Sequence, residues 1–543
     1  MPAPRSATLQ ALADAPFDLL IIGGGITGAG IARDAALRGF RTAVIDKGDF
    51  GAGTSSHSSR LIHGGIRYLE QGALKLVFEA SHERRVLLKI APHLVRPLAF
   101  LFPVYRGSRV PAWKLRAGMW LYDLLAAFRN VHRHRWYGVK QVRSIEPGLR
   151  DRGLVGAALY YDAQVDDARL VLATLRSALA AGALAANYVE ATALLKPDGR
   201  VRGAAVRDVL TGETATIRAH VVVNATGPWS DDVRRLDDPS SSPLLRPTKG
   251  VHVTVARRRI GNEHAITLIS QLDGRVMFVL PWDDLAYIGT TDTDADASPD
   301  ALRISAADVT YLLRSANAAF PDAHLTTNDV VSAWVGLRPL LRQDHANPSA
   351  VSREHRVVES AQGLLSIAGG KLTTYRVMAR DVVDRVAARL HEQDGRRLAG
   401  RPATDGLPLV GGEAAELDVL IEAARARGAP EATARHLVAS YGSEAAAVLN
   451  LVDRDRSLGQ AIVAGRPEIW AEVTHAVERE MAMRVQDVMI RRLHLYYELS
   501  DRAQRVIPQV AARMKQLLGW DDTREAEELR DYFQIVERGR IKV

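Results

Sequence analysis

Phe17-Asp-Leu-Leu-Ile-Ile-Gly-Gly-Gly-Ile-Thr-Gly-Ala-Gly30 combines a buried-strand pattern with a glycine-rich turn and is the most informative segment of the chain. Its first six residues form an apolar run typical of a parallel strand that is covered on both faces. Gly23, Gly25 and Gly28 then give the G-x-G-x-x-G spacing: the first permits a tight turn, the second lets the backbone approach a pyrophosphate, and the third lets helix and strand pack closely. The run therefore predicts a Rossmann-like nucleotide-binding unit.

The residues after this turn complete the unit. Residues 26–38 predict a helix that ends at Gly39, and the free N–H groups at its start would face the phosphates. Residues 41–45 predict a second strand that ends in Asp46, 18 positions beyond Gly28. Roughly 20 positions are expected for a carboxylate that binds a ribose hydroxyl. This fingerprint predicts a dinucleotide but leaves open whether it is FAD or NAD.

Composition limits the chemistry that the chain can perform. The chain has 543 residues, enough for two or three domains, and no cysteine. Disulfides, Cys-ligated zinc, iron–sulfur clusters and thiol catalysis are therefore excluded. Redox chemistry would need a bound organic cofactor or a metal site without cysteine ligands. No metal site is expected. Residues 1–16 lack a long apolar core and no run of about 18 apolar residues follows, so we expect neither an export signal nor a membrane span.

A basic segment at residues 105–143 carries the net charge. It contains nine Lys or Arg and one acid, Asp123, so its charge equals the formal +8 of the whole chain. Apolar residues recur in it at spacings of three and four, which predicts an amphipathic helix near 113–128. The apolar stripe consists of Trp113, Ala117, Trp120, Leu121, Leu124, Leu125 and Phe128. The flanking cations are Arg106, Arg109, Lys114, Arg116, Arg129, Arg133 and Arg135.

Three interpretations of this segment stay open. Cationic flanks beside Trp and an apolar stripe suit an anionic bilayer surface. A core helix with solvated basic ends explains the same composition. A nucleic-acid surface is disfavoured, because the aromatic residues follow one helical stripe and do not alternate with the charges as stacking platforms.

The remaining patterns predict three domains. Alternation in residues 250–255 and apolar runs at 276–280 and 286–289 predict a mixed or antiparallel substrate domain at about 246–359. The strand near 215–223 and residues 364–376, which repeat the order of strand, glycine turn and helix, belong to the nucleotide domain. We therefore expect an α/β fold, with a discontinuous nucleotide-binding domain at about 17–245 and 360–395.

The third domain is helical and covers residues 401–543. Helices are expected near 413–427, 430–440, 467–498 and 501–518. No motif there carries chemistry, so we interpret the domain as an accessory cap that supports or oligomerises the catalytic part. Whether the chain forms a homodimer stays open.

Seven motifs follow one another along the chain: Ile22-Gly-Gly-Gly-Ile-Thr-Gly-Ala-Gly-Ile-Ala32, Thr54-Ser-Ser-His-Ser-Ser-Arg-Leu-Ile-His-Gly-Gly-Ile-Arg-Tyr-Leu69, Val165-Asp-Asp-Ala-Arg-Leu170, Asn224-Ala-Thr-Gly-Pro-Trp229, Ile288-Gly-Thr-Thr-Asp292, Gly336-Leu-Arg-Pro339 and Gly369-Gly-Lys-Leu-Thr-Thr-Tyr-Arg376. Together they resemble the FAD-dependent glycerol-3-phosphate dehydrogenases of the quinone-linked respiratory type. The resemblance covers about residues 17 to 380, and less distinctively the helical end. It implies FAD as the cofactor.

The resemblance also implies which residues bind FAD. The segment from Thr54 to Gly65 would lie along the flavin and pyrophosphate, and the turn at 224–227 would close over the nucleotide end. The turn at 369–370 would open a helix aimed at the flavin's pyrimidine edge, where Lys371 stabilises negative charge. The implied cofactor-binding residues are Gly23, Gly25, Ile26, Thr27, Gly28, Asp46, Thr54, Ser55, Ser56, Ser59, His63, Gly64, Gly65, Asn224, Ala225, Thr226, Gly227, Gly369, Gly370, Lys371, Leu372 and Thr373.

A phosphorylated alcohol substrate needs cations at fixed positions, and arginine supplies planar paired donors. By the resemblance, Arg67 and Arg338 bind the phosphate, Tyr68 lies beside them and Lys371 serves phosphate and flavin together. Histidine suits the hydroxyl proton because its ordinary pKa is near 6.5. His252 and His63 are the candidates for the base, and either one as a structural histidine is the alternative.

The reaction implied is oxidation of sn-glycerol 3-phosphate to dihydroxyacetone phosphate, with electrons passed to a membrane quinone. The protein would then associate peripherally with the cytoplasmic face of the inner membrane through residues 105–143. The alternatives are a glycerol-3-phosphate oxidase that uses oxygen and an FAD-dependent amine or amino-acid oxidase. A non-catalytic flavoprotein that binds nucleic acid is a further rival, but we expect no nucleic acid as a partner.

Overall fold

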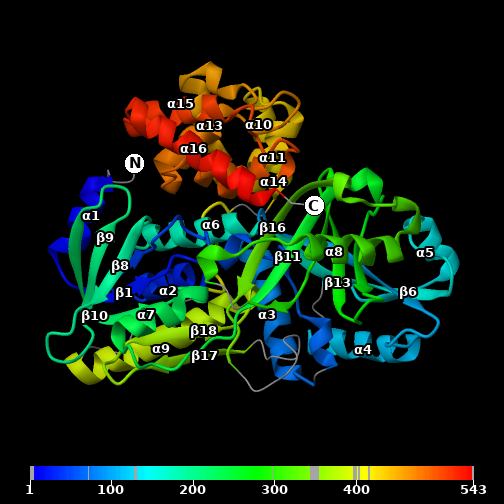
Figure 1. Ribbon diagram of the computed structural model, residues 1–543, viewed down its shortest axis with the longest axis horizontal. Coiled ribbons are helices and arrows are strands. Elements are labelled where there is room, and N and C mark those ends of the chain that lie inside the picture. Colours follow the sequence, from blue (N-terminus) through cyan, green and yellow to red (C-terminus); the bar gives the residue numbers. More distant parts are fainter. Residues whose placement is uncertain are drawn as a thin grey trace.

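The computed structural model describes residues 5–70, 72–126, 131–295, 298–342, 354–395, 400, 404–413 and 416–540, without the side chains of Arg67, Gln393 and Asp394. Two β-sheets lie side by side, each with helices against it (Figure 1). The C-terminal helices, coloured orange to red, form a separate layer above both sheets in this view. The predicted fold class is confirmed.

The first sheet contains the predicted βαβ unit. Its strands run in the order β17-β18-β10-β1-β2-β7, and β9 joins β8 to β10 in antiparallel fashion. β1 pairs in parallel with both β10 and β2, as the glycine motif requires. The strands are β1 (Phe17–Ile22), β2 (Thr42–Ile45), β7 (Leu184–Ala186), β8 (Val189–Leu194), β9 (Gly203–Asp208), β10 (Thr214–Asn224), β17 (His355–Glu359) and β18 (Leu365–Gly369).

Burial on both faces explains why β1 is apolar throughout. Leu19 and Ile21 pack into one cluster with residues of α2, α6 and α9, whereas Leu20 and Ile22 pack into a second cluster that includes Leu12 of α1. A polar side chain on either face would be desolvated there without a partner. The helices around this sheet are α1 (Arg5–Asp14), α2 (Ile26–Leu37), α6 (Asp167–Ala180), α7 (Ser230–Asp237) and α9 (Tyr375–Asp394).

The second sheet is mixed, mainly antiparallel, and runs in the order β15-β11-β14-β13-β12-β4-β6-β3, with β16 beside β11 and β5 beside β6. Its strands are β3 (Leu61–Ile62), β4 (Val95–Tyr105), β5 (Arg135–Gly138), β6 (Leu154–Val165), β11 (Thr248–Ala256), β12 (Ala265–Ile269), β13 (Val276–Trp282), β14 (Leu285–Gly289), β15 (Thr293–Asp294) and β16 (Val330–Arg338). The helices beside it are α3 (Leu74–Ile90), α4 (Ala112–Leu125), α5 (Val139–Ile145) and α8 (Ala306–Ala319).

The sheets differ from the predicted domain boundaries in three places. Residues 61–62 and residues 95–165, both predicted to lie in the nucleotide domain, supply β3, β4, β5 and β6 to the second sheet. β17, assigned to the substrate domain, pairs with β18 of the first sheet instead. The reason is long-range pairing: β4 lies against β6 over its whole length and also contacts β12. The boundaries otherwise stay a prediction.

The C-terminal layer is helical, as predicted, but more interrupted. The expected helix at 467–498 is divided, since Met481 and His494 adopt positive φ angles of 54° and 59°. Between them lies a short π-helix, Asp487–Arg492, which departs from the regular α-helical hydrogen bonding. The helices are α10 (Leu417–Ala426), α11 (Glu431–Tyr441), α12 (Ala445–Arg454), α13 (Trp470–Glu480), α14 (Leu495–Glu498), α15 (Ile507–Leu518) and α16 (Asp522–Gly539).

Candidate active site

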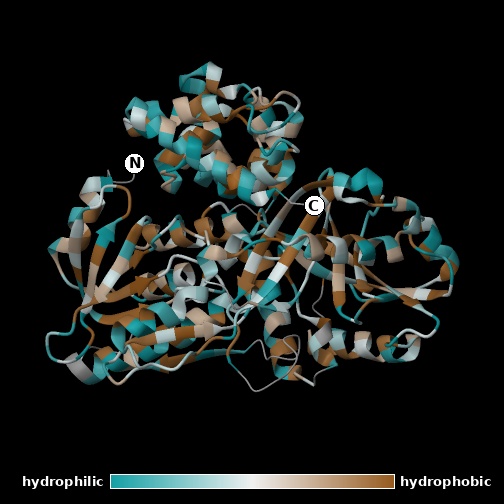
Figure 2. Ribbon diagram, viewed as in Figure 1, coloured by the Kyte–Doolittle hydropathy of each residue, from teal (hydrophilic) through white to brown (hydrophobic). Residues whose placement is uncertain are grey.

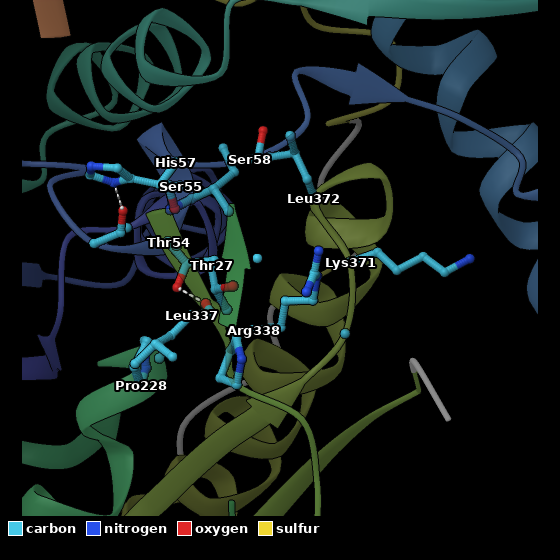
Figure 3. Close-up of a pocket in the computed structure, with 18 of the residues that line it drawn as sticks. Thr27, Thr54, Ser55, His57, Ser58, Pro228, Leu337, Arg338, Lys371 and Leu372 are labelled. Atoms are coloured by element: carbon cyan, nitrogen blue, oxygen red, sulfur yellow. Dashed lines mark hydrogen bonds between the residues drawn. The ribbon is translucent and has the colours of Figure 1, made fainter. Parts of the chain in front are cut away.

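A cavity of about 1640 Å³ is lined by residues of both sheets. Ordinary small-molecule pockets enclose about 300 to 1,000 Å³, so this cavity has room for a dinucleotide and a second small molecule. Figure 3 shows side chains from α2, the loop after β2, the end of β16 and the turn after β18 around one space. Segments far apart in the sequence therefore meet here.

The glycine turn forms one wall of the cavity. Gly23 has a φ of 107°, and a Cβ atom on it would lie 2.6 Å from the carbonyl oxygen of Ala225, so no larger residue fits. The backbone N–H of Ile26, at the start of α2, donates to Ser55 Oγ at 3.0 Å. The amides at this helix start and the neighbouring hydroxyls are the donors that a pyrophosphate requires, so the wall fits the predicted nucleotide.

Asp46 lies at the end of β2, where the fingerprint places a ribose-binding carboxylate. Its oxygens accept the backbone N–H groups of Gly24 at 2.7 Å and Gly48 at 2.8 Å. Burial raises the pKa of Asp46 to about 6, although those two N–H donors counteract the shift. Each carboxylate oxygen has a further lone pair, so a hydroxyl donor can still bind.

Three side chains that the sequence analysis did not assign close the nucleotide end of the cavity. Lys47 Nζ lies 4.6 Å from the ring centroid of Trp229 and 3.2 Å from Asp300 Oδ2. Trp229 Nε1 donates to the same carboxylate at 3.2 Å. Trp229 belongs to a quoted motif and could have been singled out, but Asp300 comes from the substrate domain and has no local signal.

The loop after β2 lies along the middle of the cavity. Thr54 Oγ1 donates to the carbonyl of Leu337 at 2.6 Å, drawn as a dashed line in Figure 3. Ser58 Oγ donates to Asp167 Oδ2 at 2.6 Å, and Ser59 Oγ shares a hydrogen bond with His252 Nε2 at 2.9 Å. The loop is thus tied to the substrate sheet on one side and to α6 on the other.

The turn after β18 points a helix start at the cavity. Gly369 and Gly370 have φ angles of 77° and 89°, and a Cβ on Gly369 would lie 2.4 Å from the carbonyl of Glu354. A 3₁₀ turn and then α9 follow at once, so backbone N–H groups and the positive end of a helix dipole face this region. Lys371 Nζ lies 3.8 Å from the ring centroid of Tyr68.

Arg338 ends β16 and lines the cavity. Its guanidinium donates to Asp292 Oδ1 at 3.0 Å, Thr290 Oγ1 at 2.9 Å and the carbonyl of Thr291 at 3.2 Å. These bonds fix the plane of the guanidinium. Asp292 and Thr290 lie in a quoted motif, but their contact with Arg338 depends on sheet pairing and could not be deduced from the motif alone.

Of the two candidate histidines, His252 has the more constrained surroundings. Its ring stacks on Trp334 with centroids 4.9 Å apart, and only 3% of the residue is exposed. Burial, together with the charges of Arg338 and Arg60, holds the pKa of His252 well below its ordinary value. Its Nδ1 atom is buried without a hydrogen-bond partner among the described residues. The ring is therefore neutral at pH 7, and it also lines the cavity.

Most of the predicted site residues meet at this cavity. Those that line it are Gly23, Gly25, Ile26, Thr27, Asp46, Thr54, Ser55, Ser59, His63, Gly65, Tyr68, Ala225, Thr226, Gly227, His252, Arg338, Gly369, Gly370, Lys371, Leu372 and Thr373. The side chain of Arg67 lies outside the described part of the structure.

Four predicted residues are not among those that line the cavity, and each lies behind a segment that does. Gly28 packs against the carbonyl of Gly23, and Ser56 is buried beside His57. The N–H of Gly64 donates to Asp162, and Asn224 accepts from Thr226 at 2.7 Å.

Part of the cavity wall is aromatic, and no motif in the sequence predicts it. Phe100 stacks on Tyr160 with centroids 5.2 Å apart and meets Phe278 edge to face. All three line the cavity, but they come from β4, β6 and β13, so they converge only when the second sheet forms. At its rim, Glu70 pairs with Arg109 at 3.0 Å.

The chain matches two family sequence models. The model described as "FAD dependent oxidoreductase" matches residues 18–376, and the "C-terminal domain of alpha-glycerophosphate oxidase" matches residues 402–525. The mitochondrial glycerol-3-phosphate dehydrogenase of Homo sapiens is 38% identical over 97% of this chain and 74% of its own length. The aerobic glycerol-3-phosphate dehydrogenase of Staphylococcus haemolyticus is 34% identical over 96% of this chain and 95% of its own.

Solved structures agree with this relationship. The glycerol-3-phosphate dehydrogenase from Bacillus halodurans, solved in complex with FAD, is 31% identical, has a TM-score of 0.82, and the match covers 98% of this chain and 97% of that one. The L-alpha-glycerophosphate oxidase from Mycoplasma pneumoniae, at 16% identity and a TM-score of 0.57, shares the fold. The structural match and the long alignments above 30% identity span nearly the whole chain, which therefore belongs to the FAD-dependent glycerol-3-phosphate dehydrogenase family, with FAD as its cofactor.

Proposed function

We propose that the protein oxidises sn-glycerol 3-phosphate to dihydroxyacetone phosphate and passes the electrons to a quinone in a membrane. One observation carries the proposal: a single cavity joins the nucleotide cradle to two cations, Arg338 and Lys371, and to the neutral ring of His252. The FAD, when bound, accepts a hydride from the alcohol carbon at N5 and later releases the electrons. The names of the relatives support the same substrate.

Arg338 is the cation best prepared to hold a phosphate. Its bonds to Asp292, Thr290 and Thr291 orient the guanidinium. A guanidinium whose paired N–H groups are already oriented loses less entropy when it binds a phosphate. The partial neutralisation by Asp292 reduces the cost of keeping the charge partly buried, with 21% of its side chain exposed. Lys371 adds a second positive charge from the opposite sheet, since it follows β18.

His252 is the better candidate for the proton acceptor. The lowered pKa of His252 keeps its ring unprotonated, as a base requires, but it also makes the ring a weaker proton acceptor. The choice therefore depends on the position of His252 at the cavity. The hydrogen bond to Ser59 and the stack on Trp334 hold the ring in one orientation. His63 stays the alternative: its backbone N–H bonds Thr373 Oγ1 at 3.2 Å, and it lines the same cavity.

The surface around α4 supports a membrane partner. Trp113, Trp120 and Leu124 are 73%, 59% and 58% exposed, so this part of the apolar stripe faces outward, against the interpretation as a core helix. Leu74 and Phe78 of α3 are exposed as well, at 43% and 55%. Phe128 of the predicted stripe lies outside the described residues. An outward apolar stripe with basic flanks favours the plane of an anionic bilayer.

The position of this surface fits the proposal. α4 lies at the lower edge of Figure 1, on the opposite side of the second sheet from the C-terminal helices, and α3 packs beside it. Figure 2 shows hydrophobic residues in this part of the molecule. None of the described helices is both long and apolar enough to cross a bilayer. The exposed hydrophobic residues of α3 and α4 lead us to propose peripheral attachment through this side, on the cytoplasmic face of the inner membrane.

Oxygen is the second candidate acceptor, favoured by the match of residues 402–525 to a domain named after alpha-glycerophosphate oxidase. The acceptor can be tested directly. The enzyme is reduced without air by glycerol 3-phosphate on anionic vesicles, and is then mixed with a water-soluble quinone or with oxygen. The proposal expects the quinone to reoxidise the flavin at least tenfold faster than oxygen at equal concentration. Faster reoxidation by oxygen, with stoichiometric peroxide, would replace the quinone in the proposal.

A further inference from the structure

The loop at residues 49–60 has little regular structure of its own, yet it carries the side chains that face the middle of the cavity. It connects β2 to β3 and contains only one short 3₁₀ turn, Thr54–Ser56. Gly53, Thr54, Ser55, Ser58 and Ser59 all line the cavity. A segment of this kind keeps its shape only if neighbouring elements hold it.

The beginning of the loop is held by the C-terminal helical layer. Asp49 is 1% exposed, and its carboxylate accepts from Arg491 Nε at 2.5 Å and from Arg492 Nη2 at 3.0 Å. Both arginines belong to the short π-helix that divides the C-terminal segment. Burial alone would raise the pKa of Asp49, but the two guanidinium groups hold it below its ordinary value, so the carboxylate stays charged.

The end of the loop is held by the same layer. The guanidinium of Arg60 stacks 4.4 Å from the ring centroid of Trp282 and 5.7 Å from that of Tyr497, which lies in α14. His494, three residues earlier, bonds Asp166 at 2.8 Å. The adjacent Asp167 binds Ser58 of the loop and lies 3.9 Å from Arg60.

We propose that the C-terminal helical domain positions the flavin-facing loop, with Arg491 and Arg492 fixing its start and Tyr497 and His494 fixing its end. The domain has no catalytic motif. Its residues 491–497 nevertheless contact Asp49 at the start of the loop, Arg60 at the end of the loop, and Asp166, which is adjacent to the Asp167 that binds Ser58 of the loop. Cofactor retention therefore depends on these contacts, in addition to the residues that touch the nucleotide. Arg491 is a positioning residue, since its path to the cavity runs through Asp49.

A matched pair of variants tests this proposal. Arg491 and Arg502 are 5% and 7% exposed and both lie in the helical domain, but Arg502 bonds Val536 and Gly539 of the domain itself. Arg491→Gln is expected to release FAD roughly tenfold faster or more, measured as the rise of free flavin fluorescence well below the melting temperature. Arg491→Gln should also broaden the visible absorption band of the bound flavin. Arg502→Gln should lower the melting temperature and leave both flavin readouts unchanged.

Two further measurements keep the test decisive. Arg491→Lys keeps the positive charge, so its rate of FAD release is expected to return most of the way to the slow rate of the wild type. A purely structural effect on packing would not produce this recovery. If Arg491→Gln fails to fold, His494→Gln serves instead, with hydrogen exchange of residues 50–60 in the holoenzyme expected to rise. The proposal is overturned if FAD release in the folded variants follows the melting temperature alone, or if His494→Gln leaves exchange in the loop unchanged.

Discussion

Among single residues, Arg338 carries a positive charge at the cavity, and its hydrogen bonds to neighbouring residues orient the guanidinium. Replacing it with Gln removes the guanidinium while keeping a polar side chain beside Asp292. Charged hydrogen bonds contribute about 1.5 to 3 kcal/mol each, so we expect Arg338→Gln to raise the KM for glycerol 3-phosphate by roughly ten- to a hundredfold. Steady-state kinetics with a quinone analogue measure this change.

The control for that variant is Arg246→Gln. Arg246 pairs with Asp294 at 2.9 Å, close to the same sheet edge, but it is not among the residues that line the cavity. Its loss should leave KM within about twofold of the wild type, because exposed ion pairs contribute little. Equal KM values for the two variants would contradict the assignment of Arg338 to the phosphate.

Asp46 predicts a pH dependence of cofactor binding. Its pKa of about 6 in the apoprotein lies above the value of about 4 in an unfolded chain, so its ionisation lowers the stability as the pH rises from about 4 to about 6. A ribose hydroxyl that donates to the ionised carboxylate lowers this pKa again. Linkage then predicts that the Kd for FAD falls about tenfold from pH 5 to pH 7. Fluorescence titration measures it; Asp46→Asn should give a flat profile, and a wild-type Kd that does not change would refute the assignment.

At the scale of secondary-structure elements, α4 makes a prediction about the membrane. Trp120 in α4 and Val419 in α10 are 59% and 60% exposed, and α10 belongs to the layer on the far side of the molecule. Trp120→Glu removes an apolar anchor and adds a negative charge beside anionic lipid, so it should weaken vesicle binding at least roughly tenfold. Val419→Glu should bind as the wild type does. Flotation with anionic and neutral vesicles distinguishes these outcomes, and equal flotation of both variants would remove α4 from the account.

Elements governed by local pattern could be predicted from the sequence, whereas elements fixed by distant partners could not. β1, α2 and β2 follow from the apolar run and the glycine spacing, and they occur within one residue of the expected bounds. The sequence does not predict β4, because Pro97 and Pro103 interrupt its pattern, although β6 and β12 hold it at the centre of the second sheet.

The residues of the site fall into the same two groups, those that a local motif predicts and those that only distant contacts bring together. Glycine turns and the cations in motifs could be named in advance, because each motif carries its own chemistry in sequence order. The ion pair of Arg338 with Asp292 and the aromatic wall at Phe100 and Tyr160 arise only when strands pair. The anchoring of Asp49 by Arg491 joins residues more than 400 positions apart, and no local pattern predicts it.

At the level of the whole molecule, the first sheet, the second sheet and the C-terminal helices each have a different role. The first sheet supplies the nucleotide cradle, the second supplies Arg338 and His252, and the cavity joins the two. The proposed membrane surface lies on one side of this pair of sheets and the C-terminal helices on the other (Figure 1). In the proposed arrangement, the α4 side of the sheets meets a bilayer and the helical domain holds the loop along the cofactor.

Rapid mixing of the FAD-loaded enzyme with glycerol 3-phosphate in the absence of oxygen tests whether this substrate reduces the flavin. We expect the flavin absorbance near 450 nm to bleach in one exponential phase whose rate saturates with substrate, whereas glycerol and glycine should leave the absorbance unchanged. Bleaching by glycine, or an unchanged spectrum with glycerol 3-phosphate, would show that glycerol 3-phosphate is not the substrate.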